Sequence, residues 1–575
     1  MDKRTALDNT NDYSYSRRKW LGIAAGASIG SGLLAATGAR AEPPKHAQGT
    51  GSDLGARTYN IRDFGAKGDG STLDTDALQA AIDACTKDQG GSVLVPAGVF
   101  VIGTVELKSN VTLHLAASAK LLGTADGKQY RHVDAIPLSG DSTLGDGNVG
   151  LIFAVKADNV TIEGHGMIDG QGAQFHSPAR GVMPPAGISG DNRPYHLLFY
   201  QCQNLTLRDV FLNDSAYHSV RIIQCAFVKA EGLRIYNRVN GNNDGFHFIS
   251  CQYVHVSNCT VQCQDDACAL FGSCKFITIT NSSFSTRSSV FRFGGGEAEN
   301  IVISNCLIYE TYGCPIKMRC GPDSRFENIS FSNLIMTNVT GPISIGLGDP
   351  PRRPGAASAS ETGMAPGAPG IVRNISFSGI LATVVVPGQV PGVPFTSGYN
   401  PGEIKSCISL NGAGETFIEN IRFDDVQVTF AGGGTAEDAA VRDVPKVAGE
   451  YYEAGVFPAY GIYARRVRGL SLSNVRFDVA APELRPAIVF DHVMDAAVNG
   501  LSAQGNPQSE SLLRLIETRD VLLTASRVLT PSAVFLQVEG AGSKNITVDG
   551  GDLSKADEPL AFRAGATEDS VKLRD

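Results

Sequence analysis

The sequence predicts an all-β solenoid with a short helix over its N-terminal end, and three observations support this prediction. Glycine is frequent, at 65 of 575 residues, and only 19 % of residues are charged, which indicates many turns and little helix. A four-residue phrase, Asn followed by an apolar, a polar and an apolar residue, recurs along the chain with the alternation of a half-buried strand. The recurrence has a period of ~20–30 residues, which is typical of a β-solenoid.

The phrase begins at eight asparagines: Asn110, Asn159, Asn204, Asn300, Asn328, Asn374, Asn420 and Asn545. With variants counted, its first apolar residue recurs between positions 205 and 329 in steps of 28, 21, 23, 24 and 28 residues. Later steps lengthen to 46, 46 and 49, so either a coil lacks the phrase or a long loop is inserted. Runs rich in Pro and Gly at 349–371 and 387–402 lie in these gaps, and we expect them to be loops on the binding face.

A short helix is expected ahead of the coils. Residues 74–85 have helical spacing of apolar residues behind an Asp or Thr cap. Because the end of a solenoid exposes unpaired strand edges, a helix placed over the first coil prevents edge-to-edge association.

Four cysteines support the same periodicity. Cys202, Cys225, Cys251 and Cys274 are spaced by 23, 26 and 23 residues, which predicts a ladder of thiols in the interior. The alternative is a zinc site, because four cysteines lie close together in the sequence: Cys259, Cys263, Cys268 and Cys274. The spacing does not determine any disulfide pairing.

The N-terminal 41 residues are predicted to be a twin-arginine export signal. Arg17 and Arg18 precede a Gly- and Ala-rich apolar run, and a small-x-small cleavage pattern ends at Ala41. A transmembrane anchor is the alternative, but the run is weakly apolar for a stable span. Residues 42–57 are expected to be a linker. The remainder divides as follows: solenoid 58–575, with cap and first coils 58–120, catalytic coils 150–350, coils with loop insertions 349–461 and scaffold coils 470–575.

Three carboxylates are the candidate catalytic groups. Asp244 follows two asparagines, and Asp265 and Asp266 lie 21 and 22 residues later, one short coil away. Since stacked coils rise about 4.8 Å, the three side chains are expected to share one surface. Like charges at that distance raise at least one pKa, as a general acid beside an ionised base requires. Calcium binding or turn capping is the alternative.

Six motifs resemble known protein families over most of residues 58–430. Residues 63–70 and 90–98 resemble the opening of the pectate-lyase-like superfamily. Residues 164–172, Arg193-Pro194 and the two Asp motifs resemble glycoside hydrolase family 28, the polygalacturonases and their relatives. The resemblance implies a single-stranded right-handed parallel β-helix.

The resemblance also implies roles for the carboxylates. Asp265 is expected to be the general acid that protonates the glycosidic oxygen, and Asp244 and Asp266 are expected to activate water, giving hydrolysis with inversion. The geometry alone favours the opposite outcome, because one coil rise is nearer the ~5 Å separation of retaining enzymes. No cofactor and no metal are expected.

Departures from the family pattern direct attention to cations. The family histidine is absent, and Arg287 or Ser289 takes its position, with Arg292 nearby. Lys317 is kept, whereas the family arginine is replaced by Pro315. Arg292 and Arg319 are therefore candidates to bind a substrate carboxylate.

Further binding candidates lie near the carboxylates. Asn242 is one, and His247 is another, either as a hydrogen-bonding partner of the substrate or the acid, or as a structural residue. Any aromatic side chain that stacks on a sugar must be Tyr or Phe, and the nearest to the site in the coil register are Tyr217, Phe291 and Tyr312.

Together these patterns predict an exported glycoside hydrolase, periplasmic or extracellular, that acts on a pectic or related acidic poly- or oligosaccharide. A lyase or epimerase on the same fold, and a glycan-binding β-helix without catalysis, are the alternatives. The net charge of −9 argues against a nucleic-acid partner. We expect a monomer, without a membrane anchor once the signal is removed. The long loops, including 431–461, favour attack at chain ends.

Overall fold

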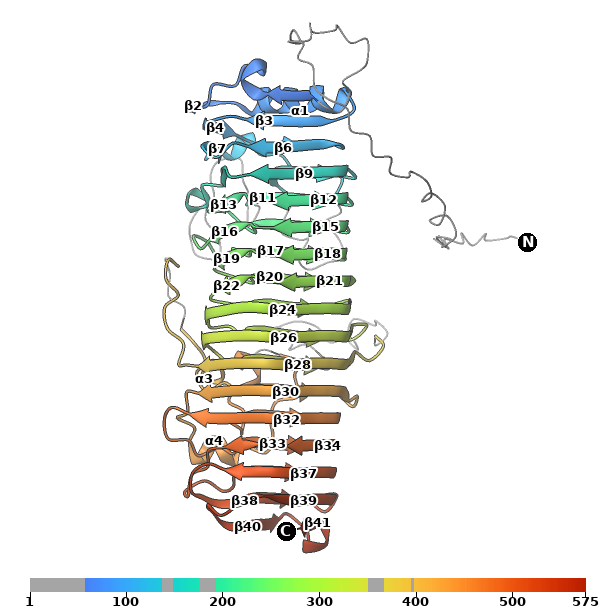
Figure 1. Ribbon diagram of the computed structural model, residues 1–575, viewed down its shortest axis with the longest axis vertical. Coiled ribbons are helices and arrows are strands. Elements are labelled where there is room, and N and C mark those ends of the chain that lie inside the picture. The colour runs from blue at the N-terminus through green and yellow to red at the C-terminus, as the bar shows by residue number, and fades with distance from the viewer. Residues whose placement is uncertain are drawn as a thin grey trace, which may run out of the picture. The chain divides into compact units, whose positions relative to one another are not determined.

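The protein is a parallel β-helix in the computed structural model, which describes residues 57–136, 148–175, 193–349, 367–393, 398–449 and 451–574. Strands of successive coils stack in parallel register into two sheets of 26 and 15 strands (Figure 1). In the smaller sheet the strands follow chain order from β5 to β40. The fold class predicted from the repeated phrase is therefore confirmed. The predicted export signal and most of the linker lie outside the described residues.

The 15-stranded sheet contains β5 (Val105–Glu106), β8 (Gly150–Val155), β11 (Tyr195–Tyr200), β14 (Val220–Ile223), β17 (Phe246–Ile249), β20 (Cys268–Phe271), β23 (Phe291–Gly294), β25 (Ile316–Cys320), β27 (Ile343–Leu347), β29 (Ile408–Gly412), β31 (Ile462–Arg465), β33 (Ile488–Asp491), β36 (Leu513–Ile516), β38 (Ser532–Glu539) and β40 (Ala556–Arg563).

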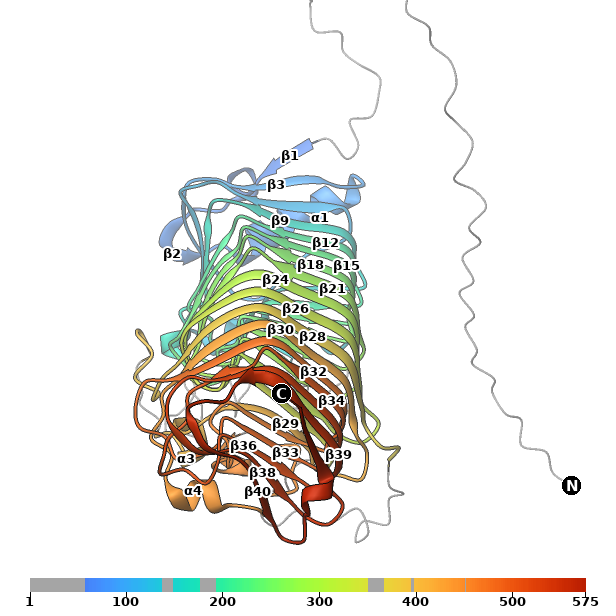
Figure 2. The same ribbon diagram turned by 60° about the horizontal axis from the view of Figure 1, so that its bottom comes forward.

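The 26-stranded sheet contains β1 (Arg57–Asn60), β2 (Asp69–Leu73), β3 (Gly91–Val95), β4 (Gly98–Ile102), β6 (Val111–Leu115), β7 (Ala119–Gly123), β9 (Asp158–Gly164), β10 (Met167–Asp169), β12 (Gln203–Arg208), β13 (Phe211–Asn213), β15 (Ala226–Glu231), β16 (Arg234–Asn237), β18 (Gln252–Ser257), β19 (Thr260–Cys263), β21 (Cys274–Thr280), β22 (Ser283–Ser285), β24 (Glu297–Thr311), β26 (Arg325–Val339), β28 (Ile371–Val384), β30 (Ile418–Phe430), β32 (Val467–Val479), β34 (Met494–Asn499), β35 (Ser502–Ala503), β37 (Arg519–Val528), β39 (Lys544–Asp552) and β41 (Val571–Arg574). Its long strands β24 to β32 bend at a corner, so each coil has three sides (Figure 2).

The helices are short apart from the first: α1 (Thr75–Lys87), α3 (Pro401–Ile404), α4 (Ala436–Ala440), α5 (Tyr451–Ala454), and the 3-10 turns η1 (Ile61–Phe64), η2 (Gly127–Gln129), η3 (Gly172–Gln174) and η5 (Glu568–Ser570). Helix α1 packs on β1, β3 and β6 and buries Leu78 and Ile82. The helix predicted over the first coil is therefore present. The Asp74 carboxylate does not bond to the helix but accepts from the Lys67 and Gly68 amides at 2.7 and 2.9 Å. No helix in the described ranges is long and apolar enough to span a membrane.

The repeated phrase forms strands of the 26-stranded sheet. Its apolar residues align across coils, as in the row Ile301, Ile329 and Ile375, and point into one continuous hydrophobic core. The asparagines stand just before these inward residues at φ of 54–65°, a left-handed conformation that Asn adopts more readily than most residues. Their side chains bond from coil to coil, for example Asn374 to Asn328 at 3.1 Å.

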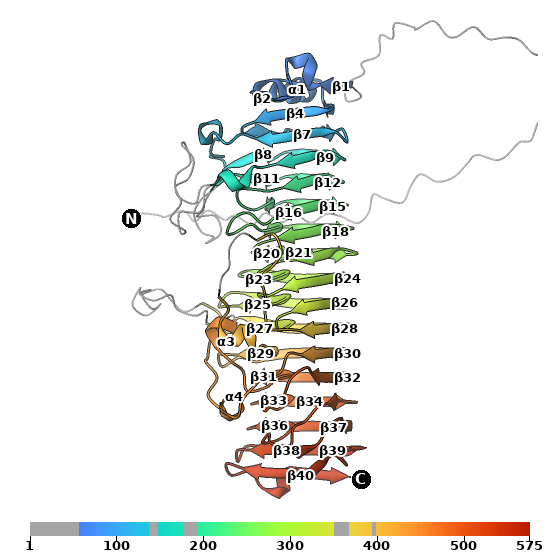
Figure 3. The same ribbon diagram turned by 90° about the vertical axis from the view of Figure 1, so that its left-hand side faces the viewer.

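The long steps after residue 329 are insertions and not missing coils. Strands β26, β28, β30 and β32 pair directly with one another, so each long step is a single coil. Two inserted segments pack on the coils. One lies against the 15-stranded sheet, beside the label α4 in Figure 3, and the other packs against Tyr312 and Arg238 in turns between the two sheets. We call residues 385–393 and 398–400 the strap, and residues 436–449 and 451–457 the cover. The predicted loop at 349–371 lies largely outside the described residues.

All twelve cysteines are buried free thiols. Cys202, Cys225, Cys251 and Cys274 occupy equivalent positions, and the Cys251 thiol donates to the Ile222 carbonyl of the preceding coil at 3.3 Å. The interior ladder is confirmed, and the alternative zinc site is wrong, because these thiols face the apolar core.

Candidate active site

Two adjacent turns, each leading into a strand of the 15-stranded sheet, bring the candidate carboxylates together. Asp244 precedes β17, and Asp265 and Asp266 precede β20. The Gly245 amide donates to the Asp266 carbonyl at 3.0 Å, so the two turns lie side by side. The separation of one coil inferred from the sequence is thus what the structure shows.

Asparagines fix the turn that carries Asp244. The Asn243 amide group donates to the carbonyls of Ser215 and Tyr217 at 3.0 and 2.8 Å, and Asn237 donates to the Asp244 carbonyl at 3.0 Å. Both asparagines are fully buried. Asn242, predicted to bind substrate, is exposed and accepts a hydrogen bond from Arg193 at 3.2 Å.

Asp266 is held by the next turn. Its Oδ1 accepts from the Ser288 hydroxyl at 3.0 Å and from the Ser289 amide at 3.2 Å, and Arg292 Nε lies 3.9 Å from Oδ2. The Asp266 amide in turn donates to Asp265 Oδ1 at 3.0 Å. Where the family pattern has a histidine, this chain therefore uses a hydroxyl and a backbone amide to orient a carboxylate.

The carboxylates have shifted protonation equilibria. Burial, followed by the charge of Asp266, raises the pKa of Asp265 to about 6, and Lys317 opposes this rise. Burial, then the charges of Asp265 and Asp266, raises the pKa of Asp244 well above its usual value, against the opposing effect of Arg221. Such a group of carboxyls supplies a proton donor and a proton acceptor at one site.

A row of polar side chains crosses the outer face of the 15-stranded sheet. The parallel register of β14, β17, β20, β23 and β25 aligns Arg221, His247, Ala269, Arg292 and Lys317. Arg221 and Lys317 are buried, with 0 % and 3 % exposure. Cations from three different coils, Arg221, Arg292 and Lys317, therefore line the strip next to the carboxylates.

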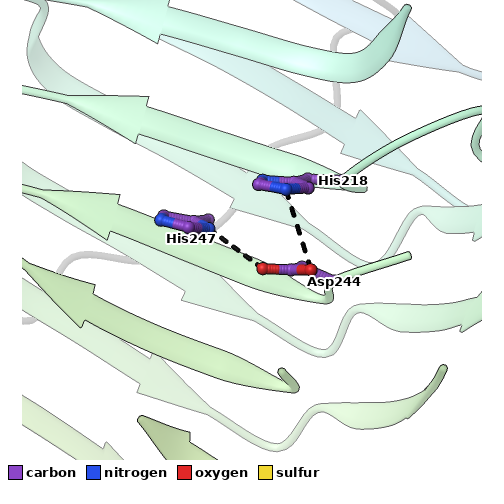
Figure 4. Close-up of side chains that lie close together, drawn as sticks. All are labelled: His218, Asp244 and His247. Atoms are coloured by element: carbon purple, nitrogen blue, oxygen red, sulfur yellow. Dashed lines mark hydrogen bonds and ion pairs between the residues drawn. The ribbon is translucent and has the colours of Figure 1, made fainter. Parts of the chain in front are cut away.

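Arg193, His218 and Arg221 were not predicted as site residues. Arg193 donates to the carbonyls of Ala216 and Gly241 at 3.1 and 2.6 Å and stacks on Tyr217. His218 and His247 stack on each other, and both face the Asp244 carboxyl (Figure 4). The sequence did contain one indication of these residues: Arg221 lies inside the apolar strand β14, and a fully buried arginine needs polar partners.

Other predicted residues have different surroundings. Phe291 lies in the core, so its proposed place as a sugar-stacking residue is wrong: Arg292, its neighbour on β23, points to the opposite side. Tyr312 packs beneath the strap against Val390 and Val393. Two other residues predicted to bind substrate contact the inserted segments. Arg287 stacks on Tyr399 of the strap, and Arg319 pairs with Glu453 of the cover at 3.3 Å.

His218, Asp244 and His247 are the one group in the described ranges that offers three ligand atoms within 4.8 Å of one another. Metal-bound histidines donate their second ring N–H to an acceptor. The second nitrogen of His218 faces the Arg221 guanidinium at 3.4 Å, which is itself a donor. These residues therefore suit a metal ion poorly.

The chain is similar to known carbohydrate-active proteins. Residues 85–361 match the model of glycosyl hydrolases family 28. An exo-poly-alpha-D-galacturonosidase of Dickeya chrysanthemi is 30 % identical over 253 residues, 37 % of this chain and 41 % of the relative. A polygalacturonase of Persea americana is 27 % identical over 295 residues, 50 % of this chain and 61 % of the relative. The matches thus span about two fifths to three fifths of these relatives.

Two solved structures share the fold. A hyperthermoactive exopolygalacturonase from Thermotoga maritima superposes with a TM-score of 0.55 at 18 % identity, over 73 % of this chain and 92 % of that one. A family 28 exopolygalacturonase of Yersinia enterocolitica gives a TM-score of 0.53 at 20 % identity, over 77 % and 78 %.

Proposed function

We propose from the family 28 match over residues 85–361 that the protein is a glycoside hydrolase of this family, acting on a pectic or related acidic poly- or oligosaccharide. The observation that carries the proposal is the site itself. Asp265, with a pKa raised to about 6, lies beside two further carboxyls and beside the cations Arg292 and Lys317. An acid that is partly protonated near neutrality is what cleavage of a glycosidic bond requires.

In the proposed reaction, Asp265 donates its proton to the glycosidic oxygen as the bond to the anomeric carbon breaks. Asp244 and Asp266 hold a water molecule and accept its proton as the water oxygen attacks the anomeric carbon. The net change is addition of one water, with a new reducing end and inverted configuration. Anomer-resolved NMR of the first product tests this: a retained configuration rejects single displacement.

The proposed substrate carries carboxylates. Lys317 is buried and aligned with Arg292, so both were desolvated when the protein folded. A substrate carboxylate that binds there forms charge-assisted hydrogen bonds, which are about twice as strong as neutral ones. Pro315 in place of the family arginine makes Arg292 the guanidinium of the proposed subsite.

We further propose attack at a chain end. Beyond Lys317 the outer face of the sheet is occupied, because Tyr463 on β31 and Val489 on β33 are buried under Phe457 and Tyr451 of the cover. The strap meets the other wall of the site, where Arg238 donates to the Pro391 carbonyl at 2.5 Å. A glycan seated at Asp265 has no continuous path toward the C-terminal coils. Release of only short products from a long polymer supports this, and early cleavage of internal bonds contradicts it.

The deciding experiment measures reducing ends released from a panel of pectic and non-pectic glycans, with and without EDTA, by wild type and by Asp265→Asn. Metal-independent release that is lost in the variant supports hydrolysis. An ultraviolet-absorbing unsaturated product indicates a lyase. Binding without any product across the panel indicates a glycan-binding protein.

We also propose that residues 1–41 direct export by the twin-arginine route, leaving a monomer without a membrane anchor. When Arg17 and Arg18 are replaced by lysine, the precursor should remain in the cytoplasmic fraction. The wild-type protein should be exported from the cytoplasm. The molar mass of the exported protein, measured by light scattering, tests whether it is a monomer.

A further inference from the structure

A continuous stack of planar side chains crosses the outer face of the 15-stranded sheet at the carboxylates. From one end to the other it contains Arg193, Tyr217, His218, His247, Phe271 and Arg292. The His218 and His247 rings are 4.6 Å apart and 7° from parallel, and Phe271 lies 5.1 Å beyond His247. Because the rings are held on both sides, the plane of each ring is fixed.

The proton of His218 can be assigned from its neighbour. Arg221 Nη1 lies 3.4 Å from His218 Nδ1, and a guanidinium only donates hydrogen bonds. Nδ1 must then be the acceptor, so the ring proton is on Nε2. That nitrogen lies 3.7 Å from Asp244 Oδ1, a long polar contact.

The proton of His247 follows from burial. Its Nδ1 lies 3.0 Å from Asp244 Oδ2, whereas its buried Nε2 has no hydrogen-bond partner among the described residues. An N–H at Nε2 would be a buried donor without an acceptor, so the single proton belongs on Nδ1. Burial, with the charges of Arg221 and Arg292, lowers the pKa of His247 well below its usual value.

We propose that His218 and His247 are neutral positioning residues whose N–H groups point at different oxygens of Asp244, His247 through a hydrogen bond of 3.0 Å and His218 from 3.7 Å, and so favour the ionised form of this carboxyl. The charged groups around the pair are Asp244 itself, Arg193 ahead of β11, Arg221 on β14, Arg292 on β23 and the neighbouring Asp265 and Asp266. Burial and two carboxylates disfavour the ionised form of Asp244, and two N–H donors oppose them. The kinetic consequence rests on the proposed function, in which Asp244 accepts a proton from water.

The first experiment reads the protons directly and needs no substrate. Histidines are labelled with 15N in the full chain, and the imidazole nitrogens are assigned with His218→Gln and His247→Gln. At pH about 6.5, the ordinary histidine pKa, we expect both rings neutral, with the proton on Nε2 of His218 and on Nδ1 of His247. A protonated ring or the opposite tautomer at either residue overturns the proposal. So does zinc binding that shifts both residues and is reversed by EDTA.

The second experiment separates the donor from the stacked ring. His247→Asn keeps an N–H near the Nδ1 position, whereas His247→Phe keeps a ring in the stack and loses the donor. We expect the acid limb of the pH profile of kcat/KM to move upward by about one to two units in the Phe variant and to return toward wild type in the Asn variant. His255→Asn, an exposed site on β18, is the matched control. Equal profiles for the Phe and Asn variants overturn the proposal. If wild type cleaves no glycan, the proposed function fails while the NMR result still decides the tautomers.

Discussion

The two sheets of the solenoid share one core but differ in their outer faces. Strands of the 26-stranded sheet alternate between buried and exposed residues, as β12 and β18 do. Strands β17 and β31 of the 15-stranded sheet are buried at every position. The cover lies over this second sheet, the strap packs on turns that lead into it, and the candidate site is on its outer face. One repeat therefore builds both a solvated wall and a desolvated site, and inserted segments make the difference.

This difference changes what a charge does. On the 26-stranded sheet, Arg422 and Asp424 pair at 3.6 Å with 63 % and 41 % exposed side chains, a setting where ion pairs contribute about 0–1 kcal/mol. On the 15-stranded sheet, burial raises the pKa of Asp244 and of Asp265. The same residue type is thus a surface charge on one side and a candidate acid or base on the other.

The largest expected effect compares carboxylates on the two sheets. Asp265→Asn should lower kcat/KM on a cleaved glycan by about 10²–10⁴-fold, since the general acid is lost. Asp424→Asn, on the outer face of β30, should leave the rate unchanged. Initial rates of reducing-end release measure both. Full activity of Asp265→Asn would remove Asp265 from the acid role.

The next effect compares the two faces of one strand. Phe377 on β28 is fully buried between Phe331 and Phe423, with ring centroids at 5.2 and 4.9 Å. Phe377→Ala should lower the free energy of unfolding by about 3–5 kcal/mol. Leu381 on the same strand is 49 % exposed, so Leu381→Ser should change it by less than about 0.5 kcal/mol. Denaturant unfolding of both variants tests the inward and outward assignment.

Stability should respond to pH through Asp265. Its pKa rises from 3.8 to about 6 in the fold, so the folded state holds the proton more tightly than the unfolded chain. As the pH rises from 3.8 to about 6, the free energy of unfolding of wild type should therefore fall, by about 3 kcal/mol at most. Asp265→Asn removes this dependence and should be the more stable protein at neutral pH. Unfolding midpoints of both proteins across this range measure it, and parallel curves would contradict it.

The smallest of these effects compares lysines. Lys317→Met should lower kcat/KM on an acidic glycan by about 10–100-fold, because a charge-assisted hydrogen bond contributes about 1.5–3 kcal/mol. It should also move the basic limb of the pH profile upward, since Lys317 lowers the pKa of Asp265. Lys229→Met, where Lys229 is half-exposed on the other sheet, is the control. An equal loss on neutral and acidic glycans would argue against carboxylate binding.

Much of the scaffold was predictable because its causes are local in the chain. The spacing of Asn300, Asn328 and Asn374 set the strand phase, and the apolar spacing after Asp74 predicted α1. The alternation of inward and outward residues, applied to β23, would have excluded Phe291 as a sugar-stacking residue once Arg292 was assigned to the outer face, because adjacent strand residues point to opposite sides.

The sequence by itself determined the coil register, and with it the meeting of Asp244 and Asp265, since a residue one period later lies one coil away. Only the tertiary structure decided what covers that meeting point. Contacts such as Arg238 to Pro391, 153 residues apart, depend on an inserted segment that reaches back across several coils. No periodicity encodes such contacts, because their positions come from the packing of irregular insertions on the sheet.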